Sequence, residues 1–285
     1  MSQSLPSTKI FIIGITLYIV DMVLNIIEIN NLYKRYGNTI ALNGINLSIA
    51  GGQIYGILGP NGSGKTTLLK IIAGILPASS GDIMVDEISV SRNSDNIKSM
   101  IGYIPETPAL YESLTPIEYF NFLASVFKID DNILRDRVNA FSNALEIGKY
   151  LDEFIGSLSF GTKQKVAIIG SLIHDPKIIV MDEGMNGLDP KSSKIIKELL
   201  KDMTKKGKTV IFSTHIMEIA ENVCDTISIL YNGNIAGTGN LDQLKNEAGS
   251  SNNDLEGIFL KLTGDEDLDN LLDSLRESIK STTPP

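Results

Sequence analysis

Cysteine, histidine and positive charge are all scarce in this chain of 285 residues. The single cysteine, Cys224, cannot form a disulfide within the chain, so it fits a reducing compartment and is expected to pack as a small apolar residue. The two histidines, His174 and His215, stand alone, so no zinc-type cluster is indicated. The net charge of -9 argues against nucleic acid as the main partner, because phosphate binding at a duplex needs a basic face.

A membrane-spanning run is also missing. The apolar stretch Ile10–Val20 is eleven residues long, whereas a spanning helix needs about 20. No small-residue cleavage site of a signal peptide follows it. Three interpretations of residues 1–21 stay open: a segment that binds a membrane surface or a partner, an extra strand, or sequence upstream of the true start. Of these, we favour Met22 as the native start, because the residues after it resemble a natural first strand.

A glycine-rich functional motif, by contrast, is present. Residues 59–66 read GPNGSGKT and follow the apolar run 53–58, which fits a phosphate loop between a strand and a helix. A chance glycine-rich turn is the alternative, and the flanking patterns disfavour it. Lys65 is expected to reach the β- and γ-phosphates, and the Thr66 hydroxyl to hold Mg²⁺. The residues predicted to bind the phosphates are Gly59, Pro60, Asn61, Gly62, Ser63, Gly64, Lys65, Thr66 and Thr67.

A second motif combines an apolar strand with two acids. Residues 178–183 read IIVMDE, and in a phosphate-loop enzyme the first acid, Asp182, helps to organise Mg²⁺ at the end of the strand. Glu183 is then placed to polarise the water that attacks the γ-phosphate. The alternative is a surface acidic pair at a strand end, which the accompanying phosphate loop disfavours.

The remaining patterns indicate an α/β protein. Apolar positions at helical spacing between Pro116 and Leu151 indicate a helical subdomain inserted into the α/β core, and Asn232-Gly233 indicates a hairpin turn. Residues after Asn240 form a polar tail. The predicted strands are 24–29, 45–49, 54–58, 83–85, 101–104, 178–181, 209–212 and 226–230, and the predicted tail helices are 255–262 and 268–279, with a loop at 249–253 and a disordered end at 281–285.

The order GPNGSGKT, LSFGTKQK, IIVMDE, GLDP and STH resembles the ATP-binding subunit of an ABC transporter. The resemblance covers residues 22–240. It implies an ABC ATPase domain over that range, with a phosphate-loop NTPase (RecA-like) core, a small antiparallel β subdomain and a helical subdomain at about residues 107–160. Residues 241–285 would then form a C-terminal tail with short helices.

The resemblance also assigns roles to residues outside the phosphate loop. Ser159 and Gly161 match the segment that caps the γ-phosphate of the opposite subunit, although Phe160 and Thr162 replace the usual glycine and glutamine. The remaining matches are Tyr36, which corresponds to the aromatic that stacks on adenine, Asp189 in the loop that links two subunits, and His215, which corresponds to a histidine on the γ-phosphate. Ordinary structural roles are the alternatives for each, and His174 is read as structural.

Glu106 departs from the family pattern, which has glutamine after the segment 101–105. A carboxylate is a hard oxygen ligand, so Glu106 joins Thr66 and Asp182 as an expected Mg²⁺ contact. The neighbouring residues resemble ATPases that serve drug, peptide-antibiotic or sodium exporters with a separately encoded permease.

The function expected from the resemblance is Mg²⁺-dependent ATP hydrolysis that powers transport, with export favoured. The partners would be a second ATPase subunit and a separate permease, and the location the cytoplasmic face of the cell membrane. Two alternatives are a non-transport ABC ATPase in translation or DNA repair and an ATP-sensing regulatory or immunity module. Glu183 argues against the sensor, which has no need of an acid that polarises water.

Overall fold

The computed structural model describes residues 9–13, 16–20, 25–248 and 255–263. Within the N-terminal apolar stretch, β1 (Lys9–Ile13) and β2 (Thr16–Val20) pair antiparallel as a two-stranded sheet of their own. The structure therefore agrees with one of the three interpretations, in which this stretch forms extra strand structure. The expected start at Met22, the loop at 249–253, the helix at 268–279 and the disordered end at 281–285 lie outside the described residues.

A six-stranded sheet forms the centre of the fold. Its order is β12-β11-β5-β10-β9-β8, and neighbouring strands are parallel except at the β11–β12 hairpin, which confirms the predicted turn at Asn232-Gly233. Strands β5, β9 and β10 are buried along their whole length, which is why they read as continuous apolar runs. The strands are β5 (Ile54–Leu58), β8 (Ile101–Ile104), β9 (Ile178–Asp182), β10 (Thr209–Thr214), β11 (Thr226–Tyr231) and β12 (Asn234–Gly239).

A second, antiparallel sheet has the order β4-β3-β6-β7. Its strands β3 (Asn25–Tyr36) and β4 (Thr39–Ala50) extend well beyond the predicted 24–29 and 45–49. Their added residues include many that are polar and exposed, so apolar content alone underestimates their length. The other strands are β6 (Ser80–Val85) and β7 (Ile88–Ser89).

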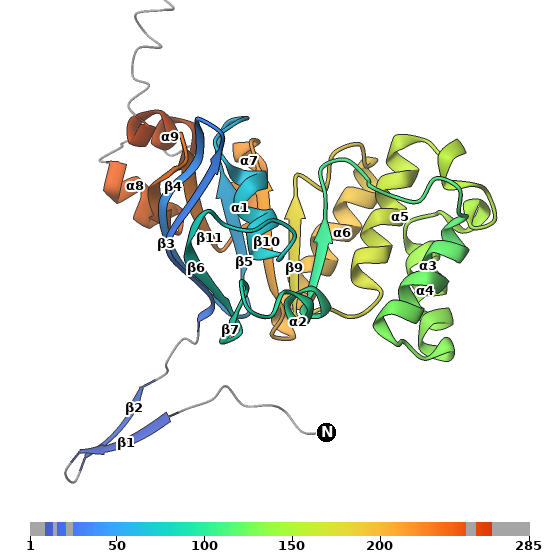
Figure 1. The fold of residues 1–285 in the computed structure, drawn as a ribbon, viewed down its shortest axis with the longest axis horizontal. Helices are drawn as coiled ribbons and strands as arrows, with labels where there is room; N and C mark the ends of the chain where they lie inside the picture. The colour runs from blue at the N-terminus through green and yellow to red at the C-terminus, as the bar shows by residue number, and fades with distance from the viewer. Residues whose placement is uncertain (1–8, 14–15, 21–24, 249–254, 264–285) are drawn as a thin grey trace, which may run out of the picture.

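Helix α1 (Lys65–Ile72) joins the two sheets. Its Leu68, Leu69 and Ile72 are buried in one apolar cluster with residues of β3, β4 and β9. Figure 1 shows α1 between the strands of the antiparallel sheet and the central sheet. The phosphate loop before α1 is therefore held in place from both sides. The short helix α2 (Ser94–Met100) leads into β8.

The predicted helical stretch after Pro116 is confirmed by α3 (Pro116–Phe127) and α4 (Asp131–Ala144). Thr115 and Glu118 form a reciprocal cap at the start of α3. Two short 3-10 turns, Gly148–Tyr150 and Ile155–Ser157, lead to α5 (Phe160–Leu172). With α6 (Pro190–Lys205), α5 buries its apolar residues in a cluster that includes β9 and β10. Figure 1 shows α3, α4 and α5 at the end of the molecule opposite the antiparallel sheet.

The C-terminal elements pack beside β11 and β12. They are α7 (Met217–Val223), α8 (Leu241–Ala248) and α9 (Leu255–Thr263), and α9 confirms the predicted helix at 255–262. Helix α8 is a short helix in the predicted C-terminal tail, at residues for which no helix bounds were predicted. Only Leu244 of α8 is buried, so its apolar signal is weak. No helix in the described parts of the chain is both long and apolar enough to cross a membrane.

Candidate phosphate-binding site

The order of the central sheet brings three motifs to one edge. Strands β5, β10 and β9 are neighbours and run parallel, so their carboxyl ends meet. The phosphate loop follows β5, Glu183 follows β9, and His215 follows β10. This edge of a parallel sheet is where α/β proteins bind their ligands.

The phosphate loop folds too tightly for side chains at two of its glycines. Gly64 has φ of 110°, and a Cβ there would lie 2.5 Å from the carbonyl oxygen of Ala41. A Cβ at Gly59 would lie 2.2 Å from the carbonyl oxygen of Leu230. The loop is therefore pressed against neighbouring backbone, and it leads directly into α1. Because the first-turn N–H groups of a helix have no partners within the helix, they are available to an anion at this end.

Lys65 is buried at the start of α1. Its Nζ donates to the carbonyl oxygens of Gly59, at 2.8 Å, and Pro60, at 3.0 Å. The same Nζ lies 3.6 Å from Oε1 of Glu183, and only 5% of the lysine and 8% of the glutamate side chain are exposed. The positive charge is thus held inside the loop, directly opposite the carboxylate that follows β9.

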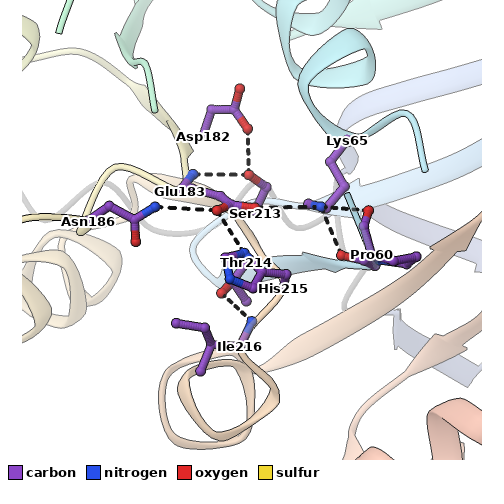
Figure 2. Close-up of polar contacts among 10 residues, drawn as sticks. Pro60, Lys65, Asp182, Glu183, Asn186, Ser213, Thr214, His215 and Ile216 are labelled. Atoms are coloured by element: carbon purple, nitrogen blue, oxygen red, sulfur yellow. Dashed lines mark hydrogen bonds and ion pairs between the residues drawn. The ribbon is translucent and has the colours of Figure 1, made fainter. Parts of the chain in front are cut away.

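Glu183 is the point on which the polar contacts converge. Its Oε2 lies 2.8 Å from Nδ1 of His215 and accepts a hydrogen bond from Nδ2 of Asn186 at 3.4 Å. Figure 2 shows Lys65, Asn186 and His215 approaching this carboxylate from different sides. The backbone of Glu183 has φ of 47°, which is uncommon for a residue other than glycine and marks local strain. A carboxylate held in this way can accept a proton from a water molecule next to the phosphate loop.

Asp182 is fixed by two hydroxyl groups. Ser213 Oγ donates to Oδ1 of Asp182 at 2.7 Å, and Tyr103 Oη donates to Oδ2 at 3.4 Å. Ser213 Oγ also accepts from the backbone N–H of Glu183 at 3.1 Å, so one hydroxyl connects both acids. Burial, followed by the charge of Asp182, raises the pKa of the Tyr103 phenol far above its usual value.

Two cavities adjoin at the phosphate loop. A cavity of about 340 Å³ is lined by most of the loop together with Glu106 and Glu183. A cavity of about 480 Å³ is lined by Thr66, Glu106 and Asp182 among others. The shared lining residues are Thr66 and Glu106. This donor set is made of hydroxyl and carboxylate oxygens, which fits Mg²⁺, because that ion is commonly bound by one or two carboxylates together with substrate phosphates.

Several predicted site residues do not line the 340 Å³ cavity. Among them, Gly59, Pro60 and Ser63 belong to the loop itself, Asp182 lines the 480 Å³ cavity and His215 contacts Glu183. The others are Tyr36, Ser159, Gly161 and Asp189. Tyr36 ends β3 with half of its surface exposed, and Lys34 Nζ lies 5.1 Å from its ring centroid. His174 is stacked on Phe127, with ring centroids 3.9 Å apart, as its structural reading expects.

Ser159 and Asp189 both cap helices. Ser159 Oγ accepts from the backbone N–H of Thr162 at 3.3 Å and begins α5. Asp189 begins α6, accepts from Ser192 and forms an ion pair of 2.7 Å with Lys165. The hydrogen bond from Lys165, with those from Ser192, lowers the pKa of Asp189 far below its usual value. The Asp189 carboxylate is therefore engaged within its own chain.

The sequence analysis did not predict the contacts that three residues make at the site, namely Ser213, Asn186 and Tyr103. Ser213 pairs with Asp182 in the β10–β9 register. Ser213 stands directly before Thr214 and His215, at the end of an apolar strand. If β9 and β10 are taken as neighbours, this position indicates that its hydroxyl lies beside the acids. Asn186 lies three residues after Glu183, and Tyr103 lies in the strand before Glu106, so both were close to motifs already identified.

Comparison with known proteins gives a consistent result. The family model described as ABC transporter matches residues 42–186. The ABC transporter ATP-binding protein NatA of Bacillus subtilis (strain 168) is 35% identical over 77% of this chain and 89% of its own length. The Nod factor export ATP-binding protein I of Burkholderia orbicola (strain AU 1054) is 31% identical over 73% of this chain and 68% of its own. The dimeric, post-hydrolysis structure of the ATP-binding cassette MJ0796 with ADP and Pi is 28% identical, with a TM-score of 0.69 over 75% of this chain and 98% of the other.

Proposed function

The chain belongs to the ABC transporter family as an ATP-binding ATPase subunit, and we propose that it uses Mg²⁺-dependent ATP hydrolysis to drive export through a separate membrane permease. The observation that carries this proposal is the convergence of Lys65, Glu183 and His215 where β5, β9 and β10 end. A buried cation that can bind the phosphates and a carboxylate that can position water are groups that γ-phosphate hydrolysis uses, and the imidazole adds a hydrogen-bond donor beside them.

In this proposal the phosphate loop and α1 hold the triphosphate. Backbone N–H groups near the α1 N-terminus surround the phosphate oxygens, whereas Pro60 has no N–H and those of Gly59 and Ser63 donate to the carbonyl oxygens of Thr214 and Pro60. Lys65 turns from the carbonyls of Gly59 and Pro60 toward the β- and γ-phosphates. Thr66, Asp182 and Glu106 would hold the metal. When bound, Mg²⁺ neutralises charge on the phosphates. Ser213 and Tyr103 hold the carboxylate of Asp182, which lines the 480 Å³ cavity.

Glu183 acts as the base in this proposal. Its Oε2 is oriented by His215 and Asn186, while Oε1 faces Lys65. Once Lys65 engages the phosphates, the carboxylate is free to accept a proton from the attacking water. His215 donates to the γ-phosphate from the same edge. The close contact between His215 and Glu183 keeps both groups on one side of the reacting phosphate.

The site is proposed to be completed by a second subunit, identical or homologous. Ser159 begins α5, whose N-terminal dipole and backbone N–H groups suit a γ-phosphate. We assign the ligand of Ser159 and Gly161 to the opposite subunit, because their match to the capping segment of the family implies it. The dimeric state of the cassette MJ0796 with ADP and Pi supports this arrangement. Tyr36 stacks on adenine. The loop 186–189 links the subunits, while the Asp189 side chain holds the end of this loop through Lys165 and Ser192 of its own chain.

Export is inferred from the relatives and from the sequence around Glu106. The relative named for Nod factor export supports it, and the proposed permease is a different chain. Through that permease the subunit would lie at the inner, cytoplasmic face of the cell membrane.

A mixing experiment tests the shared site. Ser159→Arg places a bulky cation in the cap but leaves the phosphate loop intact, and Lys65→Ala does the reverse. If two subunits share each site, a mixed dimer contains one doubly damaged site and one intact site, and ATPase activity returns in part. Co-purification with two different tags shows whether mixed dimers form. If they form but stay inactive, the hypothesis that the two shared sites work independently is contradicted.

Stimulation by the membrane partner tests the coupling. The ATPase rate, measured alone and in vesicles with the permease that co-purifies with the chain, should rise in the vesicles. A rate that no membrane protein changes would favour a non-transport ATPase, and ATP binding without turnover would favour a sensor.

A further inference from the structure

Gln164 is a fully buried polar residue in the second turn of α5. Its Nε2 donates to the carbonyl oxygen of Gly184 at 2.7 Å and to that of Pro105 at 3.4 Å. Both partners can only accept hydrogen bonds, so the amide must present its NH₂ group to them. The orientation of this side chain is therefore fixed by chemistry.

The two carbonyls belong to the segments that carry the acids of the site. Gly184 directly follows Glu183, and Pro105 directly precedes Glu106. One amide group thus connects both segments to the helix that Ser159 caps. A shift of α5 would be transmitted through these bonds to the backbone beside each acid.

The start of α5 is also packed closely against the loop that follows Glu183. A Cβ at Gly161 would lie 2.6 Å from the carbonyl oxygen of Gly187, and a Cβ at Gly187 would lie 2.5 Å from Cδ1 of Phe160. Lys165 forms its ion pair with Asp189 at the far end of this loop. Together with the bond from Gln164 to Gly184, these contacts hold the loop and the first turns of α5 as one packed unit.

The amide oxygen of Gln164, Oε1, has no hydrogen-bond partner among the described residues. A buried acceptor without a partner is unfavourable, and an apolar side chain of similar size would avoid that cost. Packing alone therefore does not account for a glutamine here. Such local conflicts are expected where a residue serves the site rather than the core.

We propose that Gln164 is a positioning residue that couples the capping segment at Ser159 to the acids Glu183 and Glu106. The inference rests on the proposed function, in which Ser159 acts on the nucleotide of the opposite subunit while the acids act on their own. Gln164 then links the two half-sites that one chain contributes. Its loss should impair turnover and ATP-dependent dimerisation but leave nucleotide binding by the phosphate loop intact.

Gln164→Met tests this with a side chain of similar length that has no donor. The turnover number should fall by about 10- to 100-fold, the order expected when catalytic groups are slightly misplaced. ATP affinity, measured with a fluorescent analogue, should stay within about threefold, because ground-state binding is unchanged. Ser171→Ala is the matched control, since Ser171 Oγ in the same helix donates to the backbone of Tyr103 at 2.7 Å. A Gln164→Met enzyme that turns over like the control overturns the proposal.

Dimerisation provides a readout that does not depend on turnover. Glu183→Gln is expected to form persistent ATP-loaded dimers, visible by size-exclusion chromatography, because the base is lost and the shape is kept. Adding Gln164→Met should raise the ATP concentration required to form these dimers by at least about tenfold. Dimers of equal strength overturn the role of Gln164. If Glu183→Gln itself forms no dimer, the composite site proposed above fails instead.

Gln164→Glu separates positioning from folding should the methionine variant be unstable. An ionised carboxylate cannot donate to the carbonyls of Gly184 and Pro105, whereas a protonated carboxyl group can donate one bond. Burial favours the protonated form, so the turnover of this variant relative to wild type should rise as the pH is lowered from the alkaline to the neutral range. A ratio that does not change with pH overturns the proposal.

Discussion

Removal of the Ser213 hydroxyl gives the sharpest test of the acidic pair. Ser213 is fully buried, and its Oγ donates to Asp182 at 2.7 Å while accepting from the backbone N–H of Glu183 at 3.1 Å. Ser213→Ala therefore removes one bond to a carboxylate and one to a backbone N–H, although that N–H keeps the carbonyl oxygen of Ser213 at 3.2 Å. The main loss is the bond to Asp182.

The size of the effect follows from the charge of the acceptor. A hydrogen bond to a charged group contributes about 1.5–3 kcal/mol, compared with about 0.5–1.5 kcal/mol for a neutral pair. We therefore expect Ser213→Ala to lose about 2 kcal/mol of stability, a fall in Tm of about 4–8 °C for a chain of this size. Asp182 and the backbone of Glu183 would also lose a shared support, so turnover should fall by about 10- to 100-fold.

Ser228→Ala is the matched control. Ser228 is also fully buried, and its Oγ forms two hydrogen bonds of 2.6 Å, to Tyr55 and Thr238. It lies in β11, separated from β10 by β5 and away from the acids. The free energy of unfolding of Ser228→Ala should fall by as much as that of Ser213→Ala or somewhat less, and its turnover should stay within about threefold of wild type.

The assay pairs urea unfolding with steady-state ATPase rates at saturating ATP, measured for both serine variants below their transition temperatures. Turnover should fall much further in Ser213→Ala than in Ser228→Ala. Equal turnover in the two variants would show that Ser213 contributes to packing and not to the arrangement of Asp182 and Glu183.

Three further predictions concern the phosphates, the metal and acid stability. Lys65→Ala should abolish both ATP binding and hydrolysis, because the buried cation opposite Glu183 is lost; wild-type hydrolysis would refute the site. Glu106→Gln should keep basal ATPase within about tenfold, or about 1.4 kcal/mol of barrier, whereas Glu106→Ala should raise the Mg²⁺ concentration needed; an unchanged Mg²⁺ titration would make Glu106 a solvated surface residue. Burial, with smaller contributions from Lys208 and Arg137, lowers the pKa of His174 from 6.5 to about 4. The unfolded chain therefore binds the proton more readily, and stability should fall as the pH drops from 6.5 toward 4, by about 2–3 kcal/mol. His174→Phe, which keeps an aromatic ring on Phe127, should lose this dependence in urea unfolding; equal pH slopes for variant and wild type would contradict it.

The sequence predicts best those elements whose burial is uniform. Strands β5, β9 and β10 are buried on both faces, so their apolar runs and the motifs directly after them can be read without knowledge of the fold. Strands β3 and β4 alternate between buried and exposed residues over much of their length, so only their most apolar parts were predicted. Helix α8 buries one leucine, so its bounds within the predicted C-terminal tail could not be read from the apolar pattern.

The sequence motifs pick out Lys65, Asp182, Glu183 and His215, but not the contacts between them nor the supporting side chains of Ser213 and Tyr103. The proximity of Glu183 and His215 depends on the order of β9 and β10 in the sheet, which no local pattern gives. The bridge made by Ser213 depends on the register of the same pair. Long-range contacts of this kind require the topology, whereas a motif requires only its own residues.

In the dimer proposed above, electrostatics favour a nucleotide between the two groups of site residues. Each chain carries a net charge of -9, so two subunits repel one another, and ATP adds further negative charge to their interface. The repulsion between distant surface charges is screened within about 8 Å at physiological salt, whereas contacts with buried groups are screened much less. Lys65, the N-termini of α1 and α5 and a bound Mg²⁺ would act at that short range. The association of two such subunits is therefore expected to depend on the γ-phosphate that these groups share, and to weaken once that phosphate is released.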